Sequence, residues 1–379
     1  MKKLFLLVLS ATLIIGCASS SDKTNESGPK LIKDKIDQLV RENQIPGLNL
    51  SIIYQDGKQE NYSSGFANLA DSLKMNAEIV MFSGSIGKTY AVAQIMQLVD
   101  EGKIDLQKKL LDYFPEIEWL KYLPNISDIT IEMLLQHTSG LPRYVMKPQI
   151  WDTLSKNPDK IWTYEDRLSV IFDDKPEHKA GKGWSYSDTN YILLGMLIEK
   201  ITGTPYYEGL KSKILIPENL NLTYAANTRT IKNLPIGYSR LPEMFKMPDK
   251  VVMDGVYAFN PQMEWTGGGI ASTTSDLAKW AKIYYEGKLF SDTLLKKMIT
   301  PNINGITIED SLAYGMGSFI YTTKHGKVYG HTGFVPGFVS IFAYYPEQKI
   351  AMAMQINCDF AKEKMSLIDY LDEIYSVLN

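Results

Sequence analysis

Ser85 and Lys88 are the residues whose types and spacing could do chemistry. They lie three positions apart at the start of an expected helix, so their side chains share one face and their heads can meet. A hydroxyl beside an amine in a half-buried site can form an activated nucleophile, because desolvation lowers the pKa of the amine and the neutral amine can then take the hydroxyl proton. The same Ser-x-x-Lys spacing occurs at Ser20 and Ser27 in a polar stretch, so the spacing alone carries little weight.

A helix that ends near Gly102 must position this pair. Residues 80–102 combine a short apolar approach, a turn with two glycines and apolar residues at helical spacing. Gly102 follows the last periodic residue and is a C-terminal stop signal. The apolar positions that predict a buried helix are Ala91, Val92, Ile95, Met96, Leu98 and Val99.

A second polar motif precedes a helix predicted over 189–201. Tyr186 and Asp188 alternate just before this helix, as residues presented to a cleft do. The other interpretation is that Tyr186 is a core aromatic whose hydroxyl bonds to the backbone, which is common for buried tyrosines. The motif therefore needs support from elsewhere in the chain.

A third motif, His331-Thr332-Gly333, lies in a strand-rich segment. A lone histidine in a strand is more often a hydrogen-bonded structural residue than a catalyst, so this motif is also ambiguous by itself. The spacing of the four histidines matches no metal pattern, and we expect neither a metal site nor a cofactor. The other three are His137, His178 and His325.

The pattern along the chain predicts an α+β fold. Strands are expected at both ends of the chain, whereas about 105–260 is expected to be a mainly helical and looped insertion. We therefore expect a central antiparallel sheet built from both chain ends and flanked by helices. The predicted strands are 48–54, 59–66, 318–322, 327–330, 338–345 and 349–356, the first two joined by an Asp56-Gly57 turn. Further helices are expected over 31–41, 129–137, 277–285 with Thr274 or Ser275 as N-cap, and near the C-terminus with Leu367 and Leu371 on its apolar face.

The first residues of the chain predict export. Lys2 and Lys3 precede an apolar run that is too short to span a bilayer, and residues 14–17, Ile-Ile-Gly-Cys, resemble a bacterial lipobox. The resemblance implies cleavage before Cys17 and lipid on its thiol. We expect a signal peptide at 1–16, a flexible tether at 17–29 and one domain at 30–379. The expected location is the bacterial cell envelope, facing the periplasm or the cell surface, with the outer membrane favoured.

Composition and cysteine count exclude several classes of protein. The net charge of −3 with no basic run argues against nucleic acid as a partner. If Cys17 carries lipid, Cys358 has no partner and the domain folds without a disulfide. A phosphate-binding loop around Lys88 is disfavoured, because the pattern needs glycine where this chain has Phe82.

Taken together and in this order, the three motifs resemble those of the serine hydrolases related to class C β-lactamases and penicillin-binding DD-peptidases. The resemblance covers almost the whole chain after the tether. Three other segments are similar to family hallmarks: 45–47 (Ile-Pro-Gly), 134–142 (Leu-Leu-Gln-His-Thr-Ser-Gly-Leu-Pro) and 267–273 (Gly-Gly-Gly-Ile-Ala-Ser-Thr). The resemblance implies a β-lactamase/transpeptidase-like fold.

The resemblance also implies roles for individual residues. Ser85 is the expected nucleophile, and Lys88 and Tyr186 share the proton transfers. The backbone amides of Ser85 and Phe334 are expected to form the oxyanion hole. The remaining expected substrate-binding positions are Asp188, His331, Thr332 and Gly333, while His137 is expected to be structural.

Two positions depart from the penicillin-recognising pattern. The family's Tyr-x-Asn usually ends in an amide, whereas ionised Asp188 can only accept hydrogen bonds and favours the charged form of Lys88. His331 stands where many β-lactamases carry lysine, and histidine is charged only part of the time near neutral pH. Both departures weaken the case for β-lactams and free-carboxylate substrates.

The expected function is therefore acyl transfer from an ester, an amide or a D-amino-acid peptide, with β-lactams as a further candidate and a small molecule or peptide as the partner. The alternative is a catalytically inactive envelope-binding protein that kept the fold. Asp188 is the feature that supports this alternative. The sequence specifies neither the acyl donor nor the oligomeric state.

Overall fold

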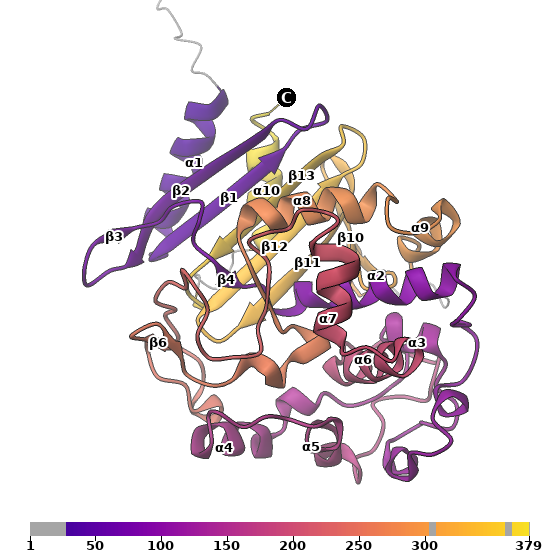
Figure 1. Ribbon diagram of the computed structural model, residues 1–379. Coiled ribbons are helices and arrows are strands. Elements are labelled where there is room, and N and C mark those ends of the chain that lie inside the picture. Colours follow the sequence, from indigo (N-terminus) through magenta and orange to yellow (C-terminus); the bar gives the residue numbers. More distant parts are fainter. Residues whose placement is uncertain (1–27, 303–307, 361–365, 379) are drawn as a thin grey trace, which may run out of the picture.

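An eight-stranded antiparallel sheet joins the two ends of the chain in the computed structural model, which describes residues 28–302, 308–360 and 366–378 (Figure 1). Strand β1 pairs with β2 on one side and with β13 on the other, so the N-terminal hairpin and the C-terminal strands form one sheet. In spatial order the strands are β3 (Leu73–Lys74), β2 (Gln59–Asn68), β1 (Gly47–Ile53), β13 (Ile350–Ile356), β12 (Phe338–Tyr345), β11 (Gly326–Val335), β10 (Phe319–Thr323) and β9 (Leu312–Tyr314). The expected α+β architecture is confirmed.

Ten α-helices and two small sheets complete the described part of the chain. The helices are α1 (Gly28–Glu42), α2 (Gly87–Asp100), α3 (Ile131–Leu135), α4 (Pro148–Lys156), α5 (Tyr164–Leu168), α6 (Asp188–Thr202), α7 (Tyr206–Leu210), α8 (Thr274–Tyr285), α9 (Asp292–Met298) and α10 (Leu367–Tyr375). The small sheets are β4 (Met81–Phe82), β8 (Ile270–Ser272) and β5 (Tyr224–Ala225), and the hairpin of β6 (Val252–Met253) with β7 (Val256–Tyr257).

Helices cover both faces of the large sheet, and each face has its own core. One core contains Ile32 and Ile36 of α1 and Leu371 of α10, packed on side chains of β1, β12 and β13. The other core contains α8, α2 and α6. Because both faces are covered, every residue of β1 and β13 is buried, which explains why β13 is a nearly continuous apolar run. In β1 the buried polar residues Asn49 and Ser51 alternate with apolar ones.

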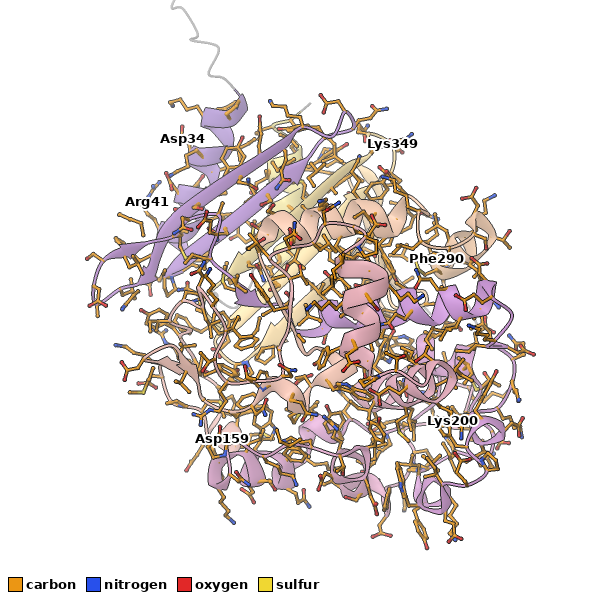
Figure 2. All side chains as sticks on the ribbon, viewed as in Figure 1. Asp34, Arg41, Asp159, Lys200, Phe290 and Lys349 are labelled. Atoms are coloured by element: carbon orange, nitrogen blue, oxygen red, sulfur yellow. The ribbon has the colours of Figure 1, made fainter. Side chains whose placement is uncertain are left out.

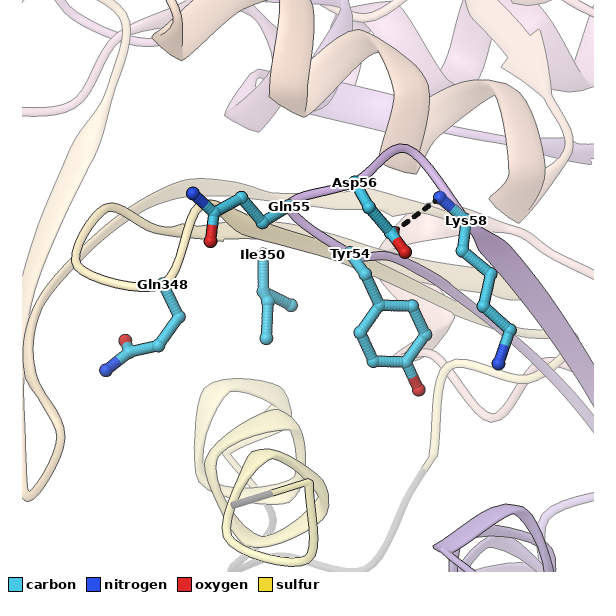
Figure 3. A pocket seen from close by; sticks show the side chains of 6 residues that line it. All are labelled: Tyr54, Gln55, Asp56, Lys58, Gln348 and Ile350. Carbon is cyan, nitrogen blue, oxygen red and sulfur yellow. Dashed lines mark hydrogen bonds between the residues drawn. The ribbon is translucent and has the colours of Figure 1, made fainter.

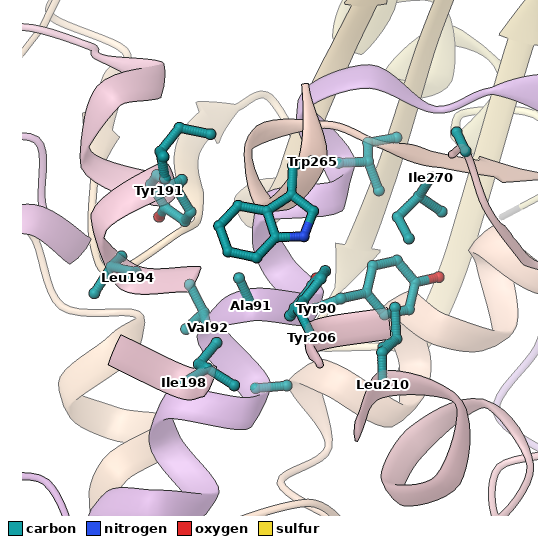
Figure 4. Close-up of a cluster of buried hydrophobic side chains, with 14 of the residues drawn as sticks. Tyr90, Ala91, Val92, Tyr191, Leu194, Ile198, Tyr206, Leu210, Trp265 and Ile270 are labelled. Carbon is teal, nitrogen blue, oxygen red and sulfur yellow. The ribbon is translucent and has the colours of Figure 1, made fainter. Parts of the chain in front are cut away.

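Helix α2 lies at the centre of the second core. Figure 4 shows Ala91 and Val92 of α2 beside Leu194 and Ile198 of α6. The apolar stripe predicted one buried face, but in the structure only Gln97, Val99 and Asp100 of α2 escape full burial. The reason is tertiary: α6 covers one side of α2, and on another side Trp280 of α8 stacks on Tyr90 with ring centroids 4.2 Å apart.

Several predicted boundaries and roles differ from the structure. Ser85 lies in a single 3₁₀ turn, η1 (Gly84–Ile86), that leads into α2, and β11 runs five residues beyond the predicted 327–330 strand. Small strands also occur in the region expected to be helical and looped. Three large aromatic side chains of this region, Trp151, Trp162 and Tyr206, are buried.

The surface carries the ordinary charges of a globular protein. The charged side chains that Figure 2 labels, such as Asp159 and Lys200, are exposed, and pairs such as Lys200 with Glu116 contribute little to stability. The predicted signal peptide, tether and lipidated Cys17 lie outside the described residues. Across 28–302, 308–360 and 366–378, the helices are too short or too polar to cross a bilayer.

The N-cap of α8 provides a test of local structure. Thr273 accepts a hydrogen bond from the backbone N–H of Asp276, so the cap lies one residue before the two predicted candidates. We expect Thr273→Ala to lower the free energy of unfolding by about 1 kcal/mol, because the N–H loses its partner. Ser275→Ala, the control, should change it by less than about 0.5 kcal/mol. Denaturant titration measures both, and a larger loss for the Ser275 variant would contradict the assigned cap.

Candidate active site

The turn that carries Ser85 lies against β11 and against the glycine run before β8. A Cβ added at Gly84 would lie 2.5 Å from the backbone nitrogen of Phe334, and one added at Gly333 would overlap the carbonyl oxygen of Ser83. Gly84 also has φ of +52°, in the left-handed region. These glycines allow two backbones to meet, so the N–H groups of Ser85 and Phe334 come from segments in direct contact.

Lys88 is fully buried and makes three hydrogen bonds. Its Nζ donates to Ser85 Oγ at 3.1 Å, to Asp188 Oδ1 at 2.7 Å and to the carbonyl oxygen of Gly267 at 2.6 Å. Burial acts to lower the pKa of Lys88, but the negative charge of Asp188 opposes it and the pKa is raised. With three protons on three acceptors, Lys88 is an ammonium in this state.

Asp188, the first residue of α6, binds two cations with its two oxygens. Oδ1 accepts from Lys88, while Oδ2 accepts from Arg143 Nε at 2.9 Å and lies 2.8 Å from Arg143 Nη2. Burial acts to raise the pKa of Asp188, but Lys88 and Arg143 hold it well below its usual range. The sequence prediction missed Arg143, whose only signal is a cation next to the quoted 134–142 segment.

Tyr186 lies over the Ser85–Lys88 pair. Lys88 Nζ is 5.0 Å from the centre of the Tyr186 ring. The Tyr186 hydroxyl is buried and has no hydrogen-bond partner among the described residues, yet Lys88 and Ser85 are near enough to lower its pKa against the larger, raising effect of burial. Ser85 itself is partly exposed, so a substrate can reach it from solvent. A hydroxyl, an amine and a phenol from two distant segments therefore converge.

His137 packs against the Tyr186 ring of this cluster. Its ring lies 4.2 Å from the Tyr186 ring, and its Nδ1 faces the backbone N–H of Ser187 at 3.1 Å and Asn190 Nδ2 at 3.0 Å. Burial and the charge of Lys88 hold the pKa of His137 well below its usual value. A neutral imidazole in this position is consistent with the structural role expected for His137.

His331 differs from expectation. It has no exposed surface, so it does not line the substrate side of the sheet edge. Its Nδ1 donates to the carbonyl oxygen of Thr332 at 2.6 Å, and its Nε2 accepts from the Tyr314 hydroxyl at 3.2 Å. Burial lowers the pKa of His331 to about 3. The expected partial charge near neutral pH is therefore wrong, because the ring is enclosed by aromatic side chains, Phe319 among them.

The other expected positions on β11 lie along an open strand edge. Strand β10 pairs with β11 only as far as Gly330, whereas β12 pairs with it through Val335. Among the described residues, 331–335 thus has a strand neighbour on one side only. Thr332 is partly exposed, and Phe334 is 45% exposed. Gly333 is buried at the contact with the Ser85 turn.

The glycine run at 267–269 supplies the acceptor for Lys88 and brings a second carboxylate near. A Cβ added at Gly268 would lie 3.0 Å from Glu264 Oε2 and 3.1 Å from the carbonyl carbon of Gly84. Burial and the charge of Asp188 raise the pKa of Glu264 to about 7. The sequence prediction missed Glu264, since an acid at the end of a loop carries no distinctive pattern.

One cavity lies next to the site, and another lies away from it. A cavity of about 440 Å³ beside Tyr186 is lined by Pro142, Arg143, Met146, Lys147, Asp174, Lys175, Glu177 and Ser185, and it gives Arg143 access to solvent. Another of about 630 Å³ lies at the β1–β2 turn, lined by Tyr54, Gln55, Asp56, Lys58, Gln348 and Ile350, and has no part of the site (Figure 3). No cluster of metal-ligating side chains occurs within the described ranges.

The buried His331 makes stability depend on pH. Because its pKa falls from about 6.5 when unfolded to about 3 in the fold, the unfolded chain binds the proton first and stability is lost as pH falls below 6.5. Between pH 7 and pH 5, His331 should account for about 2 kcal/mol of lost unfolding free energy. Denaturant titration of His331→Asn should show a loss smaller by this amount. An equal loss in both proteins would contradict the buried neutral state.

Comparison with known proteins shows which family this chain resembles. The model of the family described as Beta-lactamase matches residues 32–375. Penicillin-binding protein 4* of Bacillus subtilis is 26% identical over 307 residues, which cover 76% of this chain and 63% of that protein. Penicillin-binding protein 4 of Amycolatopsis lactamdurans is 22% identical over 335 residues, which cover 86% of this chain and 84% of that protein.

Solved structures show the same fold. A D-stereospecific amidohydrolase from a Streptomyces species has a TM-score of 0.78 at 24% identity, over 91% of this chain and 98% of that one. A D-amino acid amidase from Ochrobactrum anthropi SV3, complexed with L-phenylalanine amide, has a TM-score of 0.77 at 22% identity, over 93% and 98% of the two chains. Since the family match runs from the first helix to the last, this chain belongs to the β-lactamase family.

Proposed function

We propose that this protein is a serine hydrolase that forms an acyl-enzyme on Ser85. The observation that carries the proposal is the hydrogen bond between Lys88 Nζ and Ser85 Oγ, 3.1 Å long, at a partly exposed serine beneath Tyr186. An amine buried beside a hydroxyl is a way to activate it for attack on a carbonyl. The family membership supports the same class of chemistry.

In the proposed reaction, Ser85 Oγ bonds to the substrate carbonyl carbon and its proton passes to the Lys88–Tyr186 pair. The same pair returns a proton to the leaving group as the bond between this group and the carbonyl carbon breaks. Water then attacks the acyl-enzyme, gives up a proton to the pair and releases the acyl group, while Ser85 Oγ regains its proton. The backbone N–H groups of Ser85 and Phe334 stabilise the oxyanion. Because Lys88 rests as an ammonium, the reactive form has lost one proton, so the rate should rise with pH.

The proposed substrate is an uncharged acyl donor: an ester, an amide or a D-amino-acid peptide. Neutral His331 supplies no cation for a substrate carboxylate, which makes β-lactams a weaker candidate. The open edge of 331–335 suits an extended peptide that pairs with backbone groups. The similarity in fold to a D-amino acid amidase and a D-stereospecific amidohydrolase supports amides. We also propose a location in the cell envelope, anchored through lipid on Cys17.

The second candidate is a binding protein with this fold and no turnover. The full pairing of Lys88 favours it, since an ammonium held by Asp188 at 2.7 Å resists losing its proton. Acylation of Ser85 distinguishes the two candidates, because a binding protein without a working nucleophile reacts with no acylating probe.

The test is labelling of the full chain with a fluorescent fluorophosphonate and a fluorescent penicillin, followed by hydrolysis of p-nitrophenyl esters, nitrocefin and D-alanyl peptides. Ser85→Ala should abolish labelling, and Lys88→Ala should slow it by about 10²–10⁴-fold, because the proton transfers lose their base. Ser27→Ala removes the serine of another Ser-x-x-Lys in the same chain and should label as wild type does. Labelling that survives Ser85→Ala, or none in the wild type, would refute the proposal.

Gly333→Ala tests the oxyanion hole. The added methyl group would overlap the carbonyl oxygen of Ser83, so β11 and the Ser85 turn must separate and their N–H groups no longer converge. We expect a loss of about 10²–10³-fold in acylation rate, the usual effect of removing one oxyanion donor. The control is Gly209→Ala in α7, where the new methyl group meets the end of the flexible Gln94 side chain. Unchanged acylation by the Gly333 variant, with both proteins folded by circular dichroism, would place the oxyanion donors elsewhere.

A further inference from the structure

The carboxylate of Asp188 is shared between two cations of different exposure. Oδ1 accepts from Lys88 at 2.7 Å, and Oδ2 accepts from Arg143 Nε at 2.9 Å. The side chains of Lys88 and Asp188 are 0% and 3% exposed, whereas 41% of the Arg143 side chain is exposed. One buried anion is therefore held from both ends, by the candidate base on the inside and by a guanidinium on the solvent side.

Asp188 alone would oppose proton transfer from Ser85. A buried carboxylate at 2.7 Å stabilises the ammonium form of Lys88, which cannot accept a proton. Arg143 acts in the opposite direction for two reasons. Its charge repels a second positive charge at Lys88, and its two contacts with Oδ2 leave Lys88 one oxygen of the carboxylate. Together Asp188 and Arg143 carry no net charge and present Lys88 with one acceptor, as a neutral amide does.

We propose that Arg143 is a positioning residue for acyl transfer: with Asp188 it forms a charge-compensated pair that orients Lys88 toward Ser85 and lets Lys88 lose its proton more easily than it would beside Asp188 alone. This inference rests on the proposed function, because the role it assigns belongs to that reaction. The pair also accounts for the departure from the Tyr-x-Asn pattern, since an acid in place of the amide is matched by a cation bound to it.

The other titratable groups around this cluster come from five segments and remain the same in each variant proposed below. These groups also influence the protonation of Lys88. The test therefore compares the pH profiles of several variants with one another and does not interpret a single profile. The groups are Tyr186, Glu264, His137 and His331, with Arg167 near Glu264.

The test is the rate of fluorophosphonate labelling of Ser85 between pH 6 and pH 10.5 in four proteins. Arg143→Ala removes the compensating cation, so the profile should move to higher pH by about one unit, which is a rate about tenfold lower at a fixed pH on the rising limb. Asp188→Asn removes the anion and leaves Arg143, so the profile should move to lower pH by a similar amount. The double variant loses one charge of each sign, and its profile should return close to that of the wild type.

Two controls separate this role from a purely structural one. Arg143→Lys keeps the charge and should keep the position of the pH profile. Lys147→Ala removes a cation that pairs with Asp174 on the same cavity wall and makes no contact with Asp188, so its profile should not move. Thermal unfolding of each variant establishes that it is folded before its rates are compared.

The outcomes separate this inference from the proposed function. Opposite shifts in the single variants and their cancellation in the double variant support the charge-compensated pair. Labelling that depends on Ser85 but falls equally at every pH in both single variants overturns the pair and leaves the serine hydrolase intact. Wild-type protein that does not label at Ser85 overturns both.

Discussion

Burial of the Lys88 ammonium is the constraint on which the rest of the site depends. An unpaired charge cannot remain in a protein interior, so the fold must bring it an anion and further acceptors. These come from Asp188, 100 residues away in sequence, and from the carbonyl of Gly267, 179 residues away. The Lys88 side chain therefore holds together three segments: the start of α2, the start of α6 and the turn before β8. Loss of Asp188 would leave the buried Lys88 charge without its anion, which links the stability of this corner to the geometry that serves Ser85.

The sheet supplies the opposite wall through a steric rather than an electrostatic requirement. Gly84 and Gly333 allow the Ser85 turn and β11 to touch backbone to backbone, and side chains at either position would separate them. The pairing of β1 with β13 joins the N-terminal hairpin to the C-terminal strands, and β13 is connected to β11 through β12. The two halves of the candidate site, an ammonium-centred cluster and a strand edge, are thus held by different forces. Substitutions can affect either half independently.

Local patterns predicted the elements of this fold, and tertiary contacts decided what local patterns could not. The Asp56-Gly57 hairpin and the apolar strands were predictable because turn chemistry and alternation act within a few residues. The burial of His331 was not, because it depends on aromatics such as Phe319 and Tyr314 that pack on it from other strands. Arg143 was missed for the same reason: its partner Asp188 lies 45 residues further along the chain.

The charge of the site at neutral pH depends on Glu264 more than on the groups in direct contact. Lys88 and Arg143 bring two positive charges and Asp188 one negative charge, and mutual pairing fixes all three. The Glu264 side chain makes no hydrogen bond or ion pair with the described residues, and burial raises its pKa to about 7. The group of four therefore carries about one positive charge when Glu264 is protonated and none when it is ionised. As pH rises through 7, Glu264 ionises and its negative charge stabilises the Lys88 ammonium. Lys88 therefore holds its proton more tightly above pH 7 than below it. This effect opposes the direct gain from deprotonating Lys88, so the two should flatten the dependence of rate on pH near neutrality.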